Sequence, residues 1–322
     1  SPDINVVTAA RQRIKNVFSN GVPVYLSFSG GKDSIVLADL TYKLIQAGEI
    51  NPSQLTVLFV DEEAIFDSIE ATTKAWRKKF LLAGAKFQWW CIEVKHFSCL
   101  NELSSDETFV CWDRRKRDVW VRQPPPFAIR NHPQLRPRID NYQSFLPRVT
   151  MDGIMITGVR AAESIQRLQY MAALNMGAKG ITGTNTIYPI YDWKTTDIWT
   201  ANGKFGFDYN HLYDLYYKAG VNIERQRVAS PFLCEAQESL ALYKVIDPNT
   251  WGKMIGRVNG VNFTGIYGGT HAMGWQSVRI PEGYTWKSFM QFLLSTLPEE
   301  TRRNYLKKLT VSIEFWRTKG GC

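Results

Sequence analysis

The first half of the chain alternates between apolar runs typical of buried strands and stretches with the spacing of amphipathic helices. Apolar, β-branched and aromatic runs predict strands at Val22–Phe28, Leu55–Val60, Lys86–Val94 and Gly153–Thr157. Helical spacing predicts helices at Thr8–Ser19, Ser34–Ala47, Phe66–Ala83 and about Ala161–Leu174. Because strands and helices that alternate in this way form right-handed βαβ units, we expect an α/β fold with a doubly wound, mostly parallel sheet.

The second half follows a different pattern, and it is mostly helical. Helices are expected at Tyr209–Ala219, Leu233–Val245 and about Glu299–Arg317, with loops and short elements across the glycine-rich stretch Gly256–Gly283. We therefore predict an α/β domain over 1–205, interrupted by a long irregular insertion at 96–150, and a mainly helical C-terminal region over 206–322.

Composition excludes several classes of protein. The 322 residues are 44% hydrophobic and 21% charged, which is typical of a globular chain, and no run of eighteen apolar residues could form a membrane span. No secretory signal is visible, and the five cysteines contain no CxxC pair that would suggest a zinc site or an iron–sulfur cluster. We expect reduced thiols and a cytoplasmic location.

Positive charge is concentrated in one segment of the insertion. The formal net charge is +9, and residues 111–138 hold eight basic side chains against two acidic ones. Such a cluster indicates a surface for phosphate or nucleic acid, or else a loop whose charges only keep it in solvent. The sequence leaves both interpretations open.

The sharpest chemical signal is the hexapeptide Ser29-Gly30-Gly31-Lys32-Asp33-Ser34, between a predicted strand and a predicted helix. Two glycines permit a tight turn and a close approach of the backbone to an anion. The helix that follows presents unpaired amides and the positive end of its dipole. Lys32 adds a charge and the two serines add hydroxyl donors, so the segment predicts a phosphate-binding loop.

This hexapeptide resembles the PP-loop of the ATP pyrophosphatases, the adenine nucleotide α-hydrolase superfamily. Thr157-Gly158-Val159-Arg160 with Glu163, Ser164 and Arg167, followed by the segment Tyr188–Trp199, is similar to the phosphoadenosine phosphosulfate (PAPS) reductase branch. The stretch from Asn210 to Phe232 resembles the IbrA-type subgroup of that branch, whose members are carried by phages and genomic islands, often beside a ParB-like protein.

The resemblance implies a Rossmann-like fold with a site for ATP or PAPS and Mg²⁺. Residues 29–34 would cradle the phosphates, with Asp33 helping to hold Mg²⁺. Lys32, Asp33 and Arg160 would be the catalytic residues, while Gly158 would keep the approach open. Asp61 would contact the ribose side of the nucleotide, or it would only cap the next helix. For Arg160 and Arg167 the alternative is an ion pair with Glu163; Trp193 and Trp199 are interpreted as structural.

The sequence departs from the PAPS reductases in its cysteines. No ECGLH motif occurs, and Cys322 follows two glycines at the end of the sequence. Cys111 is the one thiol singled out for a redox or sulfur-transfer role, because the cations at 114–117 are expected to lower its pKa.

Three functions are compatible with these residues. The first is AMP-forming cleavage of ATP that activates an acceptor, possibly a nucleic acid bound by residues 111–138. The second is PAPS reduction or sulfur transfer. The third is a non-catalytic nucleotide sensor that acts in regulation or defence with a ParB-like partner.

Overall fold

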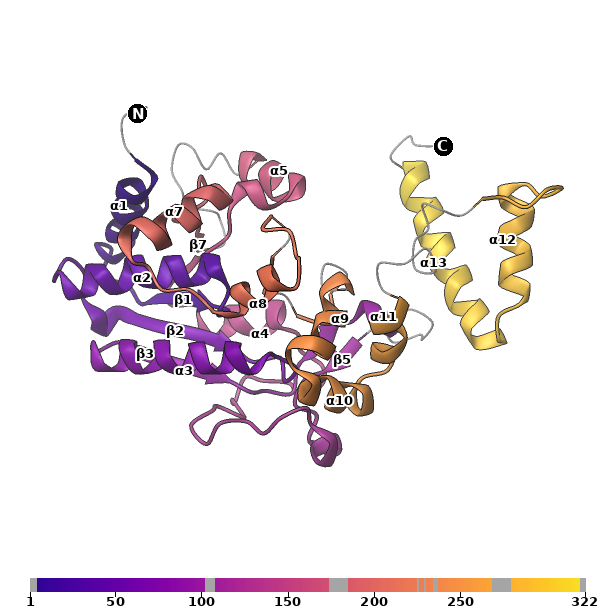
Figure 1. Ribbon diagram of the computed structural model, residues 1–322, viewed down its shortest axis with the longest axis horizontal. Helices are drawn as coiled ribbons and strands as arrows, with labels where there is room; N and C mark the ends of the chain where they lie inside the picture. The colour runs from indigo at the N-terminus through magenta and orange to yellow at the C-terminus, as the bar shows by residue number, and fades with distance from the viewer. Residues whose placement is uncertain are drawn as a thin grey trace.

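A computed structural model describes residues 5–101, 108–173, 185–224, 226–228, 230–233, 237–267 and 279–318 (Figure 1). Its strands are β1 (Val24–Phe28), β2 (Leu55–Val60), β3 (Lys86–Trp90), β4 (Lys95–Phe97), β5 (Thr108–Val110), β6 (Ile154–Thr157) and β7 (Thr186–Ile187). Five of these form one parallel sheet in the order β3-β2-β1-β6-β7. The expected α/β fold with a doubly wound parallel sheet is confirmed.

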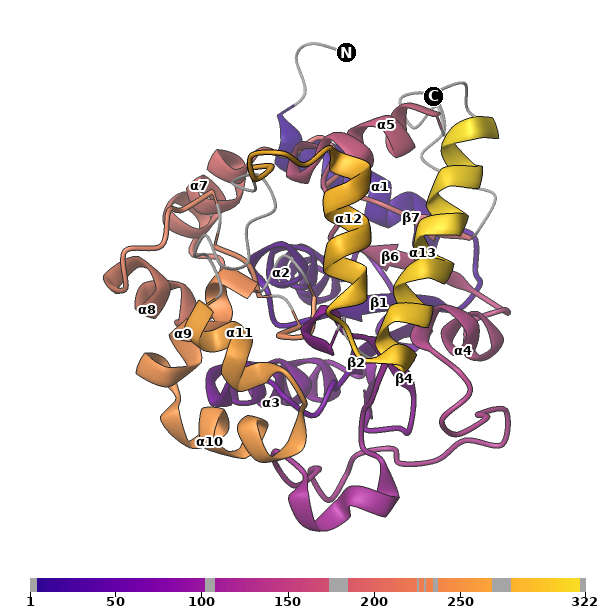
Figure 2. The same cartoon turned by 90° about the vertical axis from the view of Figure 1, so that its right-hand side faces the viewer.

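Helices cover both faces of this sheet, whose central strands β1 and β2 are mostly apolar. In the first half of the chain they are α1 (Val6–Phe18), α2 (Lys32–Gln46), α3 (Asp67–Leu82), α4 (Tyr142–Val149), α5 (Ile165–Ala173) and α7 (Thr195–Phe205). Figure 2 shows α2 and α3 on one side of the sheet and α4 on the other. Strand β2 is buried along almost its whole length, as expected for a central strand covered on both faces.

The order of the strands reverses between β1 and β6. From β1 the chain moves outward to β2 and β3, then crosses back to place β6 on the other side of β1, where Ser27 pairs with Thr157. The loops that leave the carboxyl ends of β1 and β6 therefore emerge next to each other. Ligands of open α/β sheets bind at such a switch point.

The insertion at 96–150 has more regular structure than its sequence indicates. Strands β4 and β5 form a short antiparallel pair, η3 (Arg114–Val119) is a 3₁₀ helix, and α4 ends the segment. The insertion also contains the shorter 3₁₀ turn η2 (Cys99–Asn101), while η1 (Pro52–Gln54) and η4 (Ala161–Glu163) lie outside it.

The region after α7 is helical, as expected. It contains α8 (Leu212–Lys218), α9 (Gln237–Ile246), α10 (Pro248–Arg257), α11 (Val261–Tyr267), α12 (Trp286–Ser295) and α13 (Glu299–Thr318). Helices α9 to α11 pack together beside the sheet, whereas α12 and α13 pair with each other at one end of the molecule (Figure 1). Within the described ranges, no helix combines the length and the apolar character needed to cross a membrane.

Candidate functional site

The predicted phosphate loop is a tight turn between β1 and α2. Gly30 has a φ of +73°, in the left-handed region that favours glycine, and Gly31 is the N-cap of α2. The hydroxyl of Ser34 donates to the carbonyl of Gly31 at 2.9 Å and accepts from the amide of Ser29 at 3.2 Å. The hydroxyl of Ser29 in turn accepts a long bond from the Gly31 amide at 3.4 Å. The serines thus hold the shape of the loop and occupy two of its amides.

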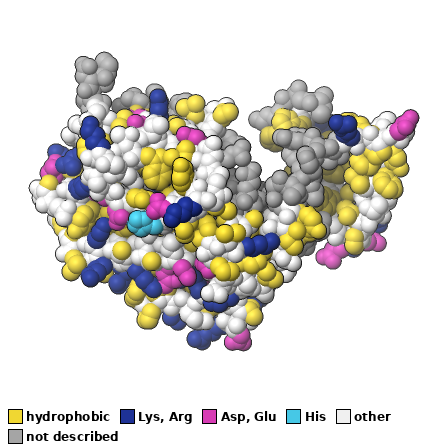
Figure 3. Space-filling view, in the orientation of Figure 1, with side chains coloured by type: hydrophobic (Ala, Val, Ile, Leu, Met, Phe, Trp, Pro, Cys, Tyr) yellow, Lys and Arg dark blue, Asp and Glu magenta, His cyan; other side chains and the backbone are white. Residues whose placement is uncertain are grey.

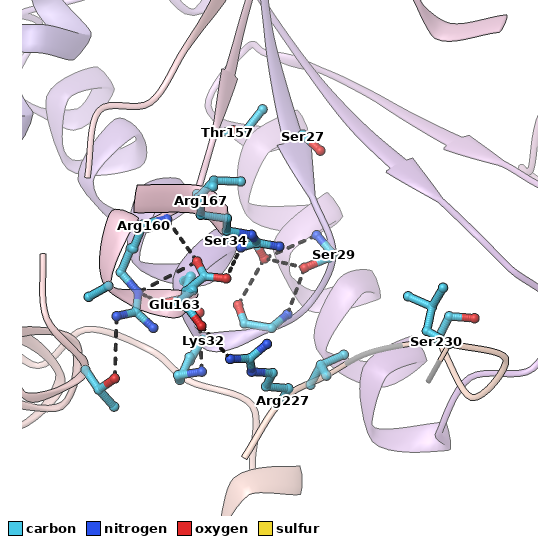
Figure 4. Close-up of a pocket in the computed structure, with 18 of the residues that line it drawn as sticks. Ser27, Ser29, Lys32, Ser34, Thr157, Arg160, Glu163, Arg167, Arg227 and Ser230 are labelled. Carbon is cyan, nitrogen blue, oxygen red and sulfur yellow. Dashed lines mark hydrogen bonds and ion pairs between the residues drawn. The ribbon is translucent and has the colours of Figure 1, made fainter. Parts of the chain in front are cut away.

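The loop opens onto a pocket of about 480 Å³ at the switch point of the sheet. Its walls come from the ends of β1 and β6, the first turn of α2, the turn η4, and the segment that follows α8 (Figure 4). Among the predicted residues, those that line it are Ser29, Gly31, Lys32, Asp33, Ser34, Gly158, Arg160 and Arg167. Segments more than a hundred residues apart in the sequence therefore meet at one pocket.

Four cationic side chains line the pocket, together with the four acidic side chains of Asp33, Glu62, Glu163 and Glu224. Figure 4 shows Lys32, Arg160, Arg167 and Arg227 turned toward the same space. Arg160 is 2% exposed and its Nε donates to Asp33. Arg167 pairs with Glu163, as the alternative interpretation of its spacing predicted, and it still lines the pocket.

Lys32 is buried at the bottom of the pocket, beside the C-terminal half of the chain. Its Nζ donates to the carbonyl of Gln226 at 3.1 Å and lies 3.3 Å from Oδ2 of Asp33. Burial lowers the pKa of Lys32, and the charge of Asp33 opposes that shift. An anion in the pocket would favour the charged ammonium in the same way.

Gly158 is required by packing rather than by access to the pocket. A Cβ at this position would lie 2.8 Å from the carbonyl oxygen of Asp33 and 2.9 Å from the amide nitrogen of Ser34. Only glycine therefore lets the end of β6 approach the first turn of α2 this closely. The reason differs from the open approach that the sequence suggested.

Asp61 does not line the pocket. It is fully buried, where it accepts from the indole of Trp89 at 2.7 Å, from the guanidinium of Arg122, and from the amide of Glu63 at 3.0 Å. The structure thus places Asp61 in the turn that precedes α3, and it does not cap that helix, whose N-cap is Phe66.

The next residue, Glu62, lines the pocket instead. Its Oε1 lies 3.0 Å from Nε2 of His96, whose Nδ1 is 2.7 Å from the carbonyl of Phe97. Burial lowers the pKa of His96, but the hydrogen bond and charge of Glu62 outweigh this and the net shift is upward. Three acids follow one another at 61–63, and the resemblance singled out only the first of them.

The segment after residue 205 supplies further pocket residues that the sequence interpretation did not single out. Tyr213, Glu224, Arg227 and Ser230 all line the pocket, and Arg227 donates to the carbonyl of Glu163 at 2.8 Å. The resemblance of residues 210–232 to one subgroup was the only signal for them, and it assigned no role to any of them.

An apolar slot of about 190 Å³ adjoins this pocket between the ends of β1 and β2. Its walls include Phe28, Leu58, Ile65, Ile69 and Tyr243, and it shares Ser27, Ser29, Glu62, Val228 and Ser230 with the charged pocket. A ligand with a flat apolar group at one end and an anionic group at the other would fit the slot and the charged pocket together.

The uncharacterized protein YbdN of Escherichia coli (strain K12) is 32% identical to this chain over 346 aligned residues, which cover 98% of this chain and 81% of YbdN. This chain belongs to the YbdN family. A family model described as a domain of unknown function, DUF3440, also matches residues 220–322. The match to YbdN thus covers the α/β half and the helical half together.

Solved structures are similar to this YbdN-family chain only at low levels. The U34-tRNA thiolase NcsA from Methanococcus maripaludis has 14% identity and a TM-score of 0.39, covering 78% of this chain and 77% of that one. The PAPS reductase from Candida auris has 11% identity and a TM-score of 0.36, with 64% and 84% covered. The NH3-dependent NAD synthetase from Campylobacter jejuni has 13% identity and a TM-score of 0.32, with 81% and 95% covered.

The cysteines of this YbdN-family chain do not form a reactive site in its described part. Cys91, Cys99 and Cys111 are all buried. The expectation for Cys111 is wrong, because burial and the charges of Glu62 and Glu63 raise its pKa well above the usual value. Cys234 and Cys322 lie outside the described residues.

The basic segment at 111–138 is largely paired with acidic groups of the protein itself. Five of its eight cations form ion pairs: Arg114 and Arg138 with Glu93, Arg115 with Asp113, Arg122 with Asp61 and Glu70, and Arg136 with Asp140. Much of the charge therefore stabilises the insertion. Lys116, Arg117 and Arg130 are exposed and form no ion pair within the described residues.

Proposed function

We propose that this protein binds an adenine nucleotide with its phosphates in the 480 Å³ pocket. The observation that carries the proposal is the meeting of the loop at 29–34 with four cationic side chains at the switch point of the sheet. Clustered guanidinium and ammonium groups at a helix N-terminus favour a polyanion such as a nucleotide's phosphate chain. Residues 29–34, Gly158, Arg160 and Arg167 are assigned to this site.

The adjoining apolar slot is assigned to the base. It lies between the ends of β1 and β2 and leads directly into the charged pocket through Ser27 and Ser29. Apolar walls with a few convergent polar groups are typical of pockets that hold a heteroaromatic ring. Asp61 is buried away from both pockets, so Glu62, which lines both, replaces it as the candidate contact to the sugar.

The reaction proposed is cleavage of ATP between its α- and β-phosphates. An acceptor nucleophile attacks the α-phosphorus, the bond from that phosphorus to the bridging oxygen breaks, and pyrophosphate leaves with the electron pair. If the acceptor is water, the products are AMP and pyrophosphate. Lys32 and Arg160 would stabilise the negative charge on the phosphoryl oxygens, and Asp33 would hold the Arg160 guanidinium in place.

Mg²⁺ would enter as part of the nucleotide complex. Magnesium prefers oxygen ligands and is usually held by one or two carboxylates together with substrate phosphates. The carboxylate of Asp33 faces Arg160 and Lys32, and no group of three potential ligands is found in the described ranges. Asp33 does not fit a direct ligand in this arrangement, so no step of the reaction is assigned to a protein-bound metal.

We prefer ATP to PAPS because the sequence has no ECGLH motif and because the described thiols are buried. Reduction of PAPS needs a thiolate that reaches the sulfur atom, and every cysteine in the described part of the chain is buried. The remaining possibilities stay predictions: membership of the IbrA-type subgroup, a ParB-like partner, a purely nucleotide-sensing role, and a nucleic-acid acceptor held by Lys116, Arg117 and Arg130.

The test is incubation of the purified protein with ATP or PAPS in the presence of Mg²⁺, with the products resolved by mass spectrometry. We expect AMP or an adenylated acceptor together with pyrophosphate from ATP. Substitution of Lys32 by Ala should lower this rate about 100-fold or more, as losing one charge-stabilising group does elsewhere.

Lys43→Ala is the matched control, because Lys43 lies on the same helix and pairs with Asp39 at its far end. Its activity should equal that of the unmodified protein. ATP binding without any product would support the sensing role, whereas an unchanged rate in Lys32→Ala would remove the loop from the mechanism.

A further inference from the structure

A tyrosine from the helical half of the chain caps the helix that follows the phosphate loop. Tyr213, in α8, is 3% exposed and lines the charged pocket. Its hydroxyl oxygen accepts a hydrogen bond of 2.9 Å from the backbone amide of Lys32, the first residue of α2. That amide is one of the groups through which a helix N-terminus attracts an anion.

The hydroxyl is rigidly placed. Asn210 donates to the carbonyl of Gly30 at 3.1 Å, which anchors the start of α8 to the loop. The tyrosine ring packs edge-on against Trp199 and lies 5.6 Å from the ammonium of Lys32. A Cβ at Gly31 would lie 3.5 Å from the tyrosine oxygen, an ordinary van der Waals contact, so the hydroxyl lies close to the loop at this point.

A hydroxyl that accepts one hydrogen bond still has its own proton to donate. Burial raises the pKa of Tyr213, with smaller opposing contributions from the Lys32 and Val228 backbone, so the phenol stays protonated in neutral solution. Across the described residues, no hydrogen bond uses this proton. The hydroxyl therefore accepts from the helix amide and still has a proton that it can donate to a ligand in the pocket.

We propose that Tyr213 is a further phosphate-binding residue. Its hydroxyl, polarised by the hydrogen bond from the Lys32 amide at the N-terminus of α2, donates to a phosphoryl oxygen in the pocket. The inference rests on the proposed function, since it requires a phosphorylated ligand there. It also gives the helical half of the chain a direct contact to the ligand, beside Arg227 in the same pocket. A second arrangement, in which the hydroxyl occupies the place of the phosphate and competes with it, has the opposite consequence.

The experiment compares Tyr213→Phe with the unmodified protein by isothermal titration calorimetry, using Mg·ATP, inorganic pyrophosphate and adenosine as three separate probes. Loss of the donor should raise the Kd for Mg·ATP and for pyrophosphate by about 10- to 150-fold, the range expected for one hydrogen bond to a charged group. The Kd for adenosine should not change, because adenosine carries no phosphate. A general disturbance of the fold would weaken all three ligands alike.

Tyr216→Phe is the matched control, because Tyr216 is equally buried in the same helix but does not line the pocket. It should leave all three affinities unchanged, and melting temperatures of both variants confirm folding. Equal or tighter binding of pyrophosphate by Tyr213→Phe overturns the inference and leaves the proposed function standing. Failure of the unmodified protein to bind any phosphorylated probe overturns both.

Discussion

Gly158 shows how one residue without a side chain positions the whole site. The end of β6 touches the first turn of α2 here, and a Cβ would lie within 3 Å of backbone atoms of Asp33 and Ser34. Backbone cannot rotate away as a flexible side chain can. A single methyl group would therefore move the phosphate loop and the strand apart.

We expect Gly158→Ala to lower the free energy of unfolding by about 1–3 kcal/mol, as overpacking does. It should also weaken binding of Mg·ATP, because the distance between Lys32 at the start of α2 and Arg160 after β6 would change. Urea denaturation and calorimetric titration measure the two effects. The control is Gly203→Ala in α7, where a Cβ meets nothing within 4 Å.

Alanine at position 203 should be neutral or stabilising by up to about 1 kcal/mol, since glycine is a poor residue inside a helix. If Gly158→Ala is as stable as this control and binds Mg·ATP equally well, close packing at Gly158 does not position the loop.

Elements with strong periodic patterns could be predicted from sequence. The strand expected at Leu55–Val60 has those bounds in the structure, and the helices that follow the first and second strands lie within two residues of their expected bounds. Those segments are long and bury a continuous apolar surface, so local pattern and tertiary packing agree. The loop at 29–34 could be predicted for a different reason, because its chemistry is contained in six consecutive residues.

Other elements depend on contacts that no local pattern records. Helix α4 contains Pro147, which suggests irregular structure, yet it begins with a capping box at Asn141 and buries Phe145. Strands β4 and β5 have three residues each, too few for an alternation to be recognised. Tyr213 and Arg227 reach the pocket only because the part of the chain that follows residue 205 folds back over the loop at 29–34.

A buried ion pair connects α10, the loop after β2 and the insertion. Arg257, the last residue of α10, donates to both oxygens of Glu63 in the loop after β2, at 2.8 and 3.1 Å. Glu63 also accepts from the amides of Trp112 and Val121 in the insertion. Both charged side chains are almost completely buried, so each one depends on the other for compensation.

We expect Arg257→Leu to cost about 3–5 kcal/mol of stability near neutral pH, because it leaves an uncompensated buried carboxylate. Burial already raises the pKa of Glu63 against the opposing charge of Arg257, and removing that charge raises it further. A carboxyl group with a raised pKa in the folded state costs no stability below its unfolded pKa, and the cost grows with pH from there until the folded group ionises. The extra loss in Arg257→Leu should therefore be smaller below the ordinary pKa of 4.5 and grow as the pH rises from the folded pKa of the unmodified protein to the higher folded pKa of the variant.

Guanidinium chloride unfolding at acidic and neutral pH measures this effect. Arg302→Leu is the control, since Arg302 and Glu299 form an exposed contact of 4.0 Å and such pairs contribute about 0–1 kcal/mol. A loss for Arg257→Leu no larger than the control would show that the pair does not link α10 to the sheet.

The molecule as a whole combines a well-buried body with a C-terminal helical hairpin that buries little. In α12 and α13, Leu294 is the only buried side chain among the described residues, while Trp286 and Trp316 are 62% and 53% exposed. Figure 3 shows apolar side chains gathered on the surface of this hairpin. By contrast, α11 buries Val261 and Thr264 against its neighbours.

Stability should follow this division, because hydrophobic stabilisation is proportional to the apolar area removed from water. We expect a chain that ends at Tyr267 to melt within about 2 °C of the full chain, a shift that corresponds to less than about 1 kcal/mol for a protein of this size. Its affinity for Mg·ATP should also be unchanged, since every residue that lines the two pockets proposed to bind the nucleotide precedes that point. A chain that ends at Val258 also loses α11 and should melt several degrees lower, which makes it the matched comparison. Differential scanning calorimetry and titration with Mg·ATP measure both quantities. A large drop in melting temperature or affinity for the first truncation would mean that the hairpin packs on the body and belongs to the functional unit.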